Sequence, residues 1–586
     1  MKLHILPLLV SLAYAGPHSC RCRPHQRCWP SPQEWNALNR SIDGNLVAVR
    51  PAAAVCHPAE ADSDACKLVT EQWTNSTWRA SQPGAVQWEN FEARPERNES
   101  CYIENPPSMP CSQGRISLYS ARAQSAAHIQ KAVRFAKRRN IRLAVKNSGH
   151  CFLGRSAAVE SLQIHTHDMK GIELVDDFHP AGAPAHAREG PAVTIDAGVS
   201  LQEMYTAVGA ANRTVVGGSS HTVGAAGGYV QGGGHSLLGP SKGMASDNAL
   251  EFTVVTAEGD LVIANQYQNR DLFWALRGGG GGTFGVVVKV TLRTFDEVPV
   301  MLTSFNITTA HGNPSFWEAL TQFHAAIPAL NDANGSGYYW IAPNVPIGGN
   351  LSAAALTAGL TFVNETDPAK IDQLFRPLLE KLNSLPGIKT EYASLPLPSV
   401  HALFNSFYLI GDHDATGTIT LLGSRLFSRD LLASTDGAGK LIAALQRLEY
   451  HPGRTLIGHM VAGGAVAANG ASVDSALHPA WRSAAVHLVL SRTWDATATP
   501  AEQKAVREKL TRVEVPVLRS VEGADAMGSY LNEANAYETD FQASFWGSNY
   551  QRLYKIKQRW DPTGVFIVQR GVGSEDWDEE GVCRKR

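Results

Sequence analysis

The sequence lacks the long apolar runs, the charge excess and the repeats that identify several large classes of protein. Beyond residue 12, no stretch reaches the ~18 to 20 uninterrupted apolar residues that cross a bilayer, so no membrane partner is expected. The formal net charge is only −2 and shows no marked asymmetry, which argues against a nucleic-acid partner. Internal repeats and low-complexity tracts are missing as well, which excludes solenoid and low-complexity proteins.

Two common nucleotide-binding motifs are also absent. A Rossmann site needs Gly-x-Gly-x-x-Gly directly after a strand, opening a helix, with an acidic residue about 20 positions on. The run 232–234 follows other glycines and precedes Leu237 and Pro240, which begin a helix poorly. No Walker loop is present. The rival enzyme hypothesis is a nicotinamide-dependent dehydrogenase. The sequence lacks the dinucleotide-binding motif that such an enzyme requires.

The N-terminus has the three parts of a cleaved signal peptide. Lys2 precedes an apolar run over 3–12, and Ala13-Tyr14-Ala15 then stands before Gly16. An anchor helix is the alternative, but the run is too short to span a membrane. We therefore predict a signal peptide over residues 1–15 and an extracellular, secreted protein.

Cysteine usage agrees with export. Eight cysteines lie near the two ends of the chain: Cys20, Cys22, Cys28, Cys56, Cys66, Cys101, Cys111 and Cys583. These eight can form disulfides in an oxidising compartment, although spacing does not give the pairing, and Cys151 is the odd one. A zinc site on Cys20, Cys22 and Cys28 is the alternative, but it lacks the usual two-residue gap between ligands. Eight glycosylation sequons indicate a glycosylated surface: Asn39, Asn75, Asn98, Asn212, Asn306, Asn334, Asn350 and Asn364.

A chain of 586 residues exceeds the ~250 to 300 residues that one core supports, so we expect at least two domains. Residues 16–110 are rich in Pro, Cys and Trp and weakly periodic, which indicates a disulfide-tied wrapping segment without chemistry of its own. Residues beyond 300 have a different secondary-structure pattern, in which predicted strands such as 352–362 alternate with predicted helices such as 367–382. This pattern predicts a second domain.

The region between these parts has an α+β pattern. Apolar residues at helical spacing after Ser125 predict a helix that ends at Asn140, followed by a buried strand over 141–145. Ser200 and Glu203 form a capping-box pattern that opens another helix. Residues 252–256 and 261–264 flank Glu258-Gly259 as a hairpin.

Glycines gather in the same region, in segments that also contain strands. They are Gly217, Gly218, Gly224, Gly227, Gly228, Gly232 to Gly234 and Gly278 to Gly282. Without a Cβ, backbone N–H groups can approach a pyrophosphate and form an anion nest, which makes a nucleotide-bearing cofactor plausible. Glycine-rich turns between strands are the purely structural alternative.

Four separated motifs carry a resemblance to a known family. They are Lys146-Asn147-Ser148-Gly149-His150 with Gly154-Arg155-Ser156; His221-Thr222-Val223-Gly224 with the glycines up to His235; Asp271 to Arg277 with Phe284-Gly285-Val286-Val287; and Tyr530-Leu531-Asn532 with Asn549, Arg552-Leu553, Lys555 and Trp560-Asp561-Pro562. In this order they resemble berberine-bridge-enzyme-like and 6-hydroxynicotine-oxidase-like members of the vanillyl-alcohol oxidase and p-cresol methylhydroxylase flavoprotein superfamily.

The resemblance implies an α+β, two-domain flavoprotein, with a split FAD-binding domain and an antiparallel-sheet substrate domain covered by helices. It assigns residues 111–297 to the FAD-binding domain and 298–525 to the substrate-binding domain. Residues 526–577 would return to the FAD-binding domain, and 578–586 would form a tail.

The resemblance also implies the site. His150 would bond the flavin 8α-methyl, Val287 would lie by the adenine, Asn532 would bond the ring system, and Tyr530 would be catalytic or orient the substrate. The implied FAD-binding residues are Asn147, Ser148, Gly149, His150, Cys151, Gly154, Gly217, Gly218, Ser219, Ser220, Thr222, Val223, Gly224, Gly227, Gly228, His235, Val287 and Asn532. No metal site is expected. The alternative for Tyr530 is a purely structural role, as an aromatic side chain packed on a strand.

Chemistry follows from the implied cofactor, because a flavin accepts a hydride at N5 while the protein supplies orientation and a base. The base is not identified; Asp412, His413, Asp414 and His459 are titratable candidates. Outside the cell, dioxygen is the expected acceptor, which favours an oxidase over a dehydrogenase. A secreted binding glycoprotein on a flavin fold is the non-enzymatic alternative. The sequence specifies neither the small-molecule substrate nor the oligomeric state.

The number of flavin bonds is a separate expectation. Doubly linked relatives carry a cysteine just before the segment that matches 221–224, where this chain has Ser220, a far poorer nucleophile. Cys151 is the possible substitute, but neighbours in an extended loop point to opposite sides, so His150 and Cys151 should not both face the ring. We therefore predict a single bond through His150.

Overall fold

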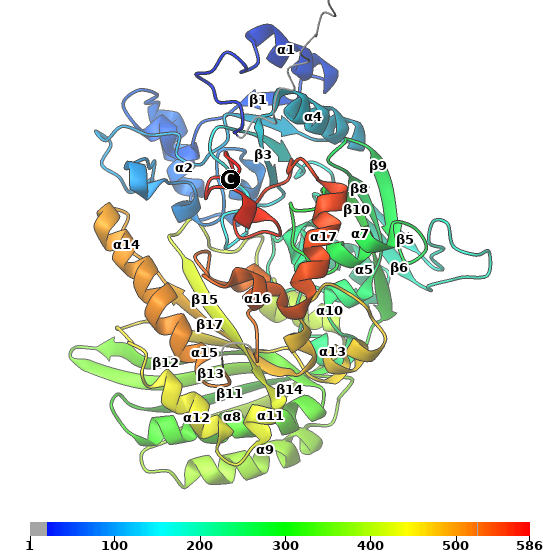
Figure 1. The fold of residues 1–586 in the computed structure, drawn as a ribbon. Helices are drawn as coiled ribbons and strands as arrows, with labels where there is room; N and C mark the ends of the chain where they lie inside the picture. The colour runs from blue at the N-terminus through cyan, green and yellow to red at the C-terminus, as the bar shows by residue number, and fades with distance from the viewer. Residues whose placement is uncertain (1–19, 524–525, 586) are drawn as a thin grey trace, which may run out of the picture.

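Three β-sheets and their covering helices form the protein in the computed structural model, which describes residues 20–523 and 526–585. The predicted signal peptide lies outside the described residues. Two of the sheets and the C-terminal helices occupy the upper part of Figure 1, and the largest sheet lies below them. The mixture of helices with mainly antiparallel strands confirms the predicted α+β class.

The first sheet has four strands in the order β1 (Leu46–Ala48), β2 (Tyr119–Arg122), β4 (Ser161–His165) and β3 (Arg142–Lys146). Its covering helix is α4 (Ala126–Arg139), whose residues Ile129, Ala132, Val133 and Ala136 are buried at helical spacing, as predicted. The Ser125 side chain caps α4, and Asn140, with φ of 49°, ends it in the left-handed conformation.

The second sheet is antiparallel. Its strands are β5 (Ile172–Val175), β6 (Ala192–Asp196), β10 (Val286–Asp296), β8 (Ala249–Val255) and β9 (Leu261–Asn265) in that order, with β7 (Arg213–Val215) paired to β10. The predicted hairpin is confirmed as β8 and β9. Helix α5 (Leu201–Ala210) begins with the predicted capping box of Ser200 and Glu203.

The third sheet is antiparallel and has seven strands. Its order is β14 (Lys389–Leu397), β11 (Val300–Ala310), β13 (Leu351–Val363), β12 (Gly335–Gly348), β16 (Leu456–Met460), β17 (Ala484–Arg492) and β15 (Leu421–Ser428). One face is covered by α8 (Ser315–Asp332), α9 (Pro368–Asn383), α11 (Arg429–Ala433) and α12 (Gly437–Leu445), at the bottom of Figure 1. The opposite face contributes Tyr338, His459 and His487 to ring contacts with His235 and Tyr530 from the rest of the chain.

Short helices connect these layers. They are α1 (Pro32–Ser41), α2 (Ser63–Gln72), α3 (Ser76–Ser81), α6 (Gly239–Lys242), α7 (Arg270–Leu276), α10 (Val400–Leu403), α13 (Gly464–Ala468), α14 (Pro500–Lys509) and α15 (Val515–Arg519). Within the described residues, no helix combines the length and the apolar character that a membrane span requires.

The C-terminal segment crosses back to the first two sheets through α16 (Phe541–Trp546) and α17 (Tyr550–Trp560). The Trp546 indole N–H donates to the Gly278 carbonyl at 3.1 Å, and the Lys557 ammonium donates to the Thr283 carbonyl at 2.7 Å. Both acceptors lie in the glycine-rich loop before β10, so this segment holds that loop in place.

Four disulfides join the eight predicted cysteines: Cys20–Cys583, Cys22–Cys28, Cys56–Cys66 and Cys101–Cys111. Cys151 is free, as predicted. The zinc alternative is excluded because Cys20, Cys22 and Cys28 are all oxidised. The Cys20–Cys583 bond joins the first and last parts of the described chain. It therefore attaches residues 578–585 to the rest of the fold.

Candidate functional site

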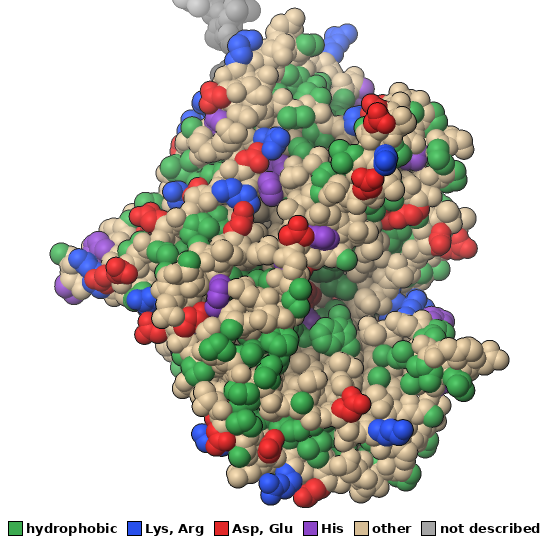
Figure 2. Space-filling model, turned by 180° about the vertical axis from the view of Figure 1, so that it is seen from behind, with side chains coloured by type: hydrophobic (Ala, Val, Ile, Leu, Met, Phe, Trp, Pro, Cys, Tyr) green, Lys and Arg blue, Asp and Glu red, His purple; other side chains and the backbone are tan. Residues whose placement is uncertain are grey.

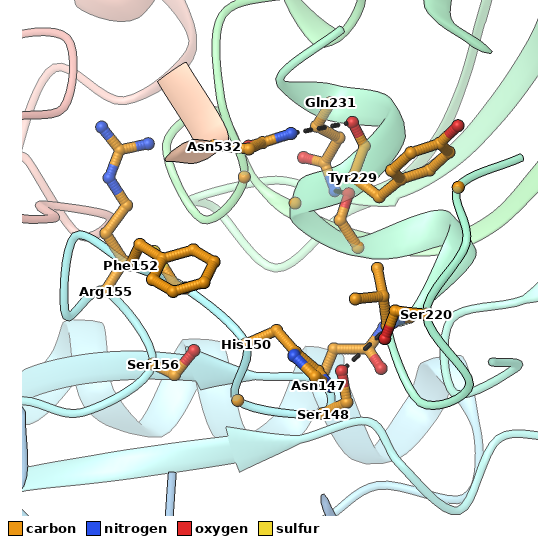
Figure 3. A pocket seen from close by; sticks show the side chains of 18 of the residues that line it. Asn147, Ser148, His150, Phe152, Arg155, Ser156, Ser220, Tyr229, Gln231 and Asn532 are labelled. Atoms are coloured by element: carbon orange, nitrogen blue, oxygen red, sulfur yellow. Dashed lines mark hydrogen bonds between the residues drawn. The ribbon is translucent and has the colours of Figure 1, made fainter. Parts of the chain in front are cut away.

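A cavity of about 400 Å³ lies against the two smaller sheets, and residues 414–416 and 530–533 complete its lining. Its walls come from the loop after β3, from the segment 218–231, from the glycine-rich loop before β10 and from residues 530–533 (Figure 3). The face of the molecule in Figure 2 is hollowed near its middle, with hydrophobic side chains around the hollow and charges of both signs scattered elsewhere.

Most of the predicted site residues meet in this cavity. Its lining includes Asn147, Ser148, Gly149, His150, Cys151, Gly218, Ser219, Ser220, Val223, Gly224, Gly227, Gly228, His235, Val287, Tyr530 and Asn532. Three predicted residues, Gly154, Gly217 and Thr222, are not part of the lining. Thr222 still acts on it, because its hydroxyl lies 2.6 Å from His150 Nε2.

The loop after β3 is held from the N-terminal segment. Gln87 donates through its side chain to the Ser148 carbonyl at 2.9 Å and through its backbone to the Gly149 carbonyl at 3.1 Å. The Trp88 indole N–H donates to the His150 carbonyl at 3.1 Å, and Trp88 itself lines the cavity. The N-terminal segment, which is expected to carry no chemistry of its own, therefore helps to shape the site. Only the tertiary fold reveals this contact.

His150 projects from this loop toward the cavity (Figure 3). Its Nε2 is engaged by Thr222, which leaves Nδ1 for a ligand. Burial, reinforced by the Lys146 charge, lowers the pKa of His150 to about 4 against a smaller opposing effect of Asp414. The imidazole is therefore neutral at neutral pH, which is the form that can act as a nucleophile.

The glycines facing this loop are explained by close packing. A Cβ at Gly224 would lie 2.3 Å from Asn147 Oδ1, and a Cβ at Gly232 would lie 2.3 Å from Asn532 Oδ1. Asn147 and Asn532 both line the cavity, so each small residue allows a polar side chain to reach it. Gly224 also donates its backbone N–H to Ser148 Oγ at 3.1 Å. The glycines therefore make room for polar groups as well as for a ligand.

Tyr530 and Asn532 lie on the opposite wall. The Tyr530 hydroxyl accepts hydrogen bonds from the Gly234 N–H at 3.2 Å and from the Asn532 side-chain amide at 2.7 Å. Burial, with a further contribution from the Glu533 charge, raises the pKa of Tyr530 well above its usual value. A phenol that stays protonated and already accepts two hydrogen bonds can donate its proton to a ligand, but it is a poor base.

A third wall contains Ser220 and Asp414, and His221 lies behind them, outside the lining. The Asp414 carboxylate accepts from the Ser220 hydroxyl at 2.6 Å and from the His221 backbone at 3.0 Å, and its other oxygen lies 2.9 Å from His221 Nδ1. Burial opposes ionisation of Asp414, but the hydrogen bonds from Ser220 and His221 outweigh it and hold the pKa of the carboxyl below its usual value.

The four candidate bases have different surroundings. Asp412 and His413 are exposed and pair with each other at 2.6 Å, and neither lines the cavity. Asp414 lines it and is hydrogen-bonded as described above. His459 lies on β16 behind the cavity wall, where its Nδ1 is 3.2 Å from the Glu533 carboxylate.

Several lining residues lie outside the segments 147–154 and 217–235 that are expected to surround FAD. They are Trp88, Val145, Arg155, Ser156, Thr166, Ala197, Leu201, Gly281, Gly282, Gly285, Ala415, Thr416 and Glu533. Most lie within a few residues of a predicted one, so a wider window around each motif would have included them. Glu533, for example, directly follows Asn532. Ala415 and Thr416 come from the large-sheet region, where no motif marks them.

Residues 118–265 match the family described as FAD binding domain, and residues 529–573 match the family described as berberine and berberine like. An uncharacterized FAD-linked oxidoreductase from Arthroderma benhamiae is 52% identical over 97% of this chain and 96% of its own. The crystal structure of the VAO-type flavoprotein MtVAO615 from Myceliophthora thermophila C1 superposes with a TM-score of 0.84 at 33% identity, covering 97% of this chain and all of the other.

Glucooligosaccharide oxidase from Acremonium strictum shares the fold, with a TM-score of 0.62 at 20% identity over 78% of this chain and 91% of the other. Its structure is described as containing a 6-S-cysteinyl, 8α-N1-histidyl FAD. The chain therefore belongs to the berberine-bridge-enzyme-like branch of the vanillyl-alcohol oxidase superfamily and is an FAD-linked oxidoreductase with the predicted two-domain flavoprotein fold.

The cavity suits such a cofactor on its own geometry. It is lined on two sides by glycine backbone, which a flat ring or a pyrophosphate can approach closely. Among the described residues, the buried Asn147 Oδ1 has no hydrogen-bond partner, so it offers an acceptor to a bound group.

Proposed function

We propose that this protein is a secreted oxidase that holds FAD through one covalent bond to His150 and oxidises a small organic alcohol, amine or sugar. The observation that carries the proposal is His150 itself: a neutral imidazole at the cavity, with Nε2 engaged by Thr222 and Nδ1 left over. Nδ1 corresponds to the N1 linkage named for glucooligosaccharide oxidase. FAD supplies a hydride acceptor that dioxygen can reoxidise with release of hydrogen peroxide.

The chain's own residues would bind the cofactor and orient the substrate. The loop 147–154 and the segment 217–235 would surround the cofactor, with Val287 by the adenine and Asn532 at the ring system. Tyr530 would orient the substrate by donating its hydroxyl proton, because the rise in its pKa keeps it protonated. Asp414 would hold Ser220 and His221 in place rather than take a proton, because its carboxylate oxygens are already hydrogen-bonded.

An aerobic screen of alcohols, amines, sugars and alkaloids, read as hydrogen peroxide, tests the function directly. A substrate should bleach the flavin band under anaerobic conditions, and air should restore the band. Bleaching without reoxidation by air would favour a dehydrogenase with another acceptor. A flavin band that no compound bleaches, while dithionite reduces it, would support a secreted binding glycoprotein on this fold.

Single attachment is tested at Cys151. Cys151→Ser should leave the flavin-bearing peptide, its linkage to His150 and the absorption spectrum unchanged. Although Cys151 lines the same cavity, neighbouring side chains in a loop tend to point to opposite sides, so its thiol is expected to face away from the ring edge that His150 reaches. Peptide mapping by mass spectrometry gives the linkage in both proteins. A thioether to flavin in the wild-type peptide, or a shifted spectrum in Cys151→Ser, would show a second bond.

Export is supported by the four disulfides and by five exposed sequon asparagines, Asn98, Asn212, Asn334, Asn350 and Asn364. We expect the mature protein to begin near Gly16 and to lose mass on enzymatic deglycosylation. Intact-mass measurement of protein from the culture medium decides both points. A secreted product that still begins at Met1 would contradict the first.

A further inference from the structure

Behind the cavity wall, a cluster of buried imidazoles surrounds one carboxylate. His459 and His487 stand directly opposite each other on the neighbouring strands β16 and β17, so the register of the sheet places both side chains on the same face. His235 and Glu533 approach that face from the flavin side and line the cavity. His487 is fully buried, and His235 and His459 are more than nine-tenths buried.

Three donor atoms of this cluster converge on one point. His459 Nδ1 lies 3.2 Å from Glu533 Oε2 and 3.4 Å from His487 Nδ1, and His487 Nδ1 lies 3.6 Å from the same Glu533 oxygen. A point equidistant from atoms in such a triangle is about 2.0 Å from each, which is the Zn–N and Zn–O bond length. Hydrogen bonds alone satisfy this arrangement poorly, since the two neutral imidazoles carry at most one Nδ1 proton each for the three contacts.

The Glu533 carboxylate supports a bound cation. Within the described part of the chain, its Oε2 is buried without a hydrogen-bond partner of acceptable geometry. The second carboxylate oxygen, Glu533 Oε1, lies 3.0 Å from His235 Nε2, and this contact fixes the orientation of the carboxylate. A ligating carboxylate held by an outer hydrogen bond is the usual arrangement at protein metal sites.

We infer that His459, His487 and Glu533 bind one divalent transition-metal ion of the Zn²⁺ class. Two imidazoles and a carboxylate on a tetrahedral ion leave a fourth position open, as at catalytic zinc sites. Glu533 and His235 line the cavity, so the proposed ion would lie next to it. An ion there would lower the pKa of a coordinated hydroxyl group. The site does not depend on the link between His150 and the flavin.

Metal binding can be measured without any substrate. Purified protein, free of affinity tag and treated with chelator that is then removed, should bind about one equivalent of Zn²⁺ by calorimetry and by elemental analysis, with a rise in its melting temperature. His459→Ala and Glu533→Gln should each lose this equivalent. Glu533→Gln keeps a side-chain oxygen beside His235, so loss of zinc in this variant would not be explained by misfolding. His413→Ala, which changes an exposed histidine outside the cluster, should bind like the wild type.

Absence of a stoichiometric site in the wild type, or equal binding by wild type, His459→Ala and Glu533→Gln, would overturn the inference and leave a hydrogen-bonded cluster. Covalent flavin in acid-precipitated samples is read separately. Wild-type protein that binds zinc but releases its flavin on acid precipitation would therefore count against the proposed cofactor linkage alone. Wild-type protein that keeps covalent flavin but binds no stoichiometric zinc would count against the metal site alone.

Discussion

In His150→Ala, covalently bound flavin should fall from about one per chain to none. The wild-type protein should remain yellow after acid precipitation, whereas the variant should release its flavin to the supernatant or be purified without it. The physical reason is local: His150 lines the cavity as a neutral, nucleophilic imidazole, and Thr222 fixes the ring through Nε2.

His413→Ala is the matched control, because His413 is exposed and lies outside the cavity. It should retain covalent flavin at the wild-type level. Thr222→Val tests whether the orientation of the His150 ring matters for attachment. His150 stays intact but its Nε2 loses the contact with Thr222, so flavin attachment should be slower or incomplete. Free flavin in the supernatant of acid-treated wild-type protein would refute the covalent link. An unchanged linkage in His150→Ala would place it on another residue.

A large loss of stability is expected for Lys557→Met. The Lys557 ammonium is almost fully buried and donates to Asp561 at 2.6 Å, to the Thr283 carbonyl at 2.7 Å and to the Phe566 carbonyl at 2.6 Å. Removing one partner of a buried ion pair leaves an uncompensated charge, here that of Asp561. The free energy of unfolding should fall by about 3 to 5 kcal/mol.

Arg559→Met provides the comparison on the same helix. Arg559 also pairs with an aspartate, Asp271, at 2.9 Å, but its side chain is 71% exposed. Its loss should change the free energy of unfolding by no more than about 1 kcal/mol. Equilibrium urea denaturation, followed by tryptophan fluorescence, measures both variants. Equal destabilisation by the two substitutions would show that burial of the Lys557 pair is not what holds the C-terminal segment to the glycine-rich loop.

Local sequence patterns predicted the elements that position the site. The apolar spacing before Asn140 fixed α4, the strand after it delivers the loop that carries His150, and the Ser200 capping box begins α5, all as observed. These features are readable because helix periodicity, capping and turn chemistry act between residues a few positions apart. The role of each site residue followed from resemblance rather than from spacing, and it remains a prediction.

What the sequence by itself determined is therefore the set of local elements, the odd cysteine and the loop that presents His150. Tertiary structure alone decided which cysteines pair, how Trp88 reaches that loop, and how His459 and His487 come to face Glu533. Such contacts join residues far apart in the chain, and the register of a sheet or the closure of a long loop depends on the packing of the whole fold rather than on any local pattern.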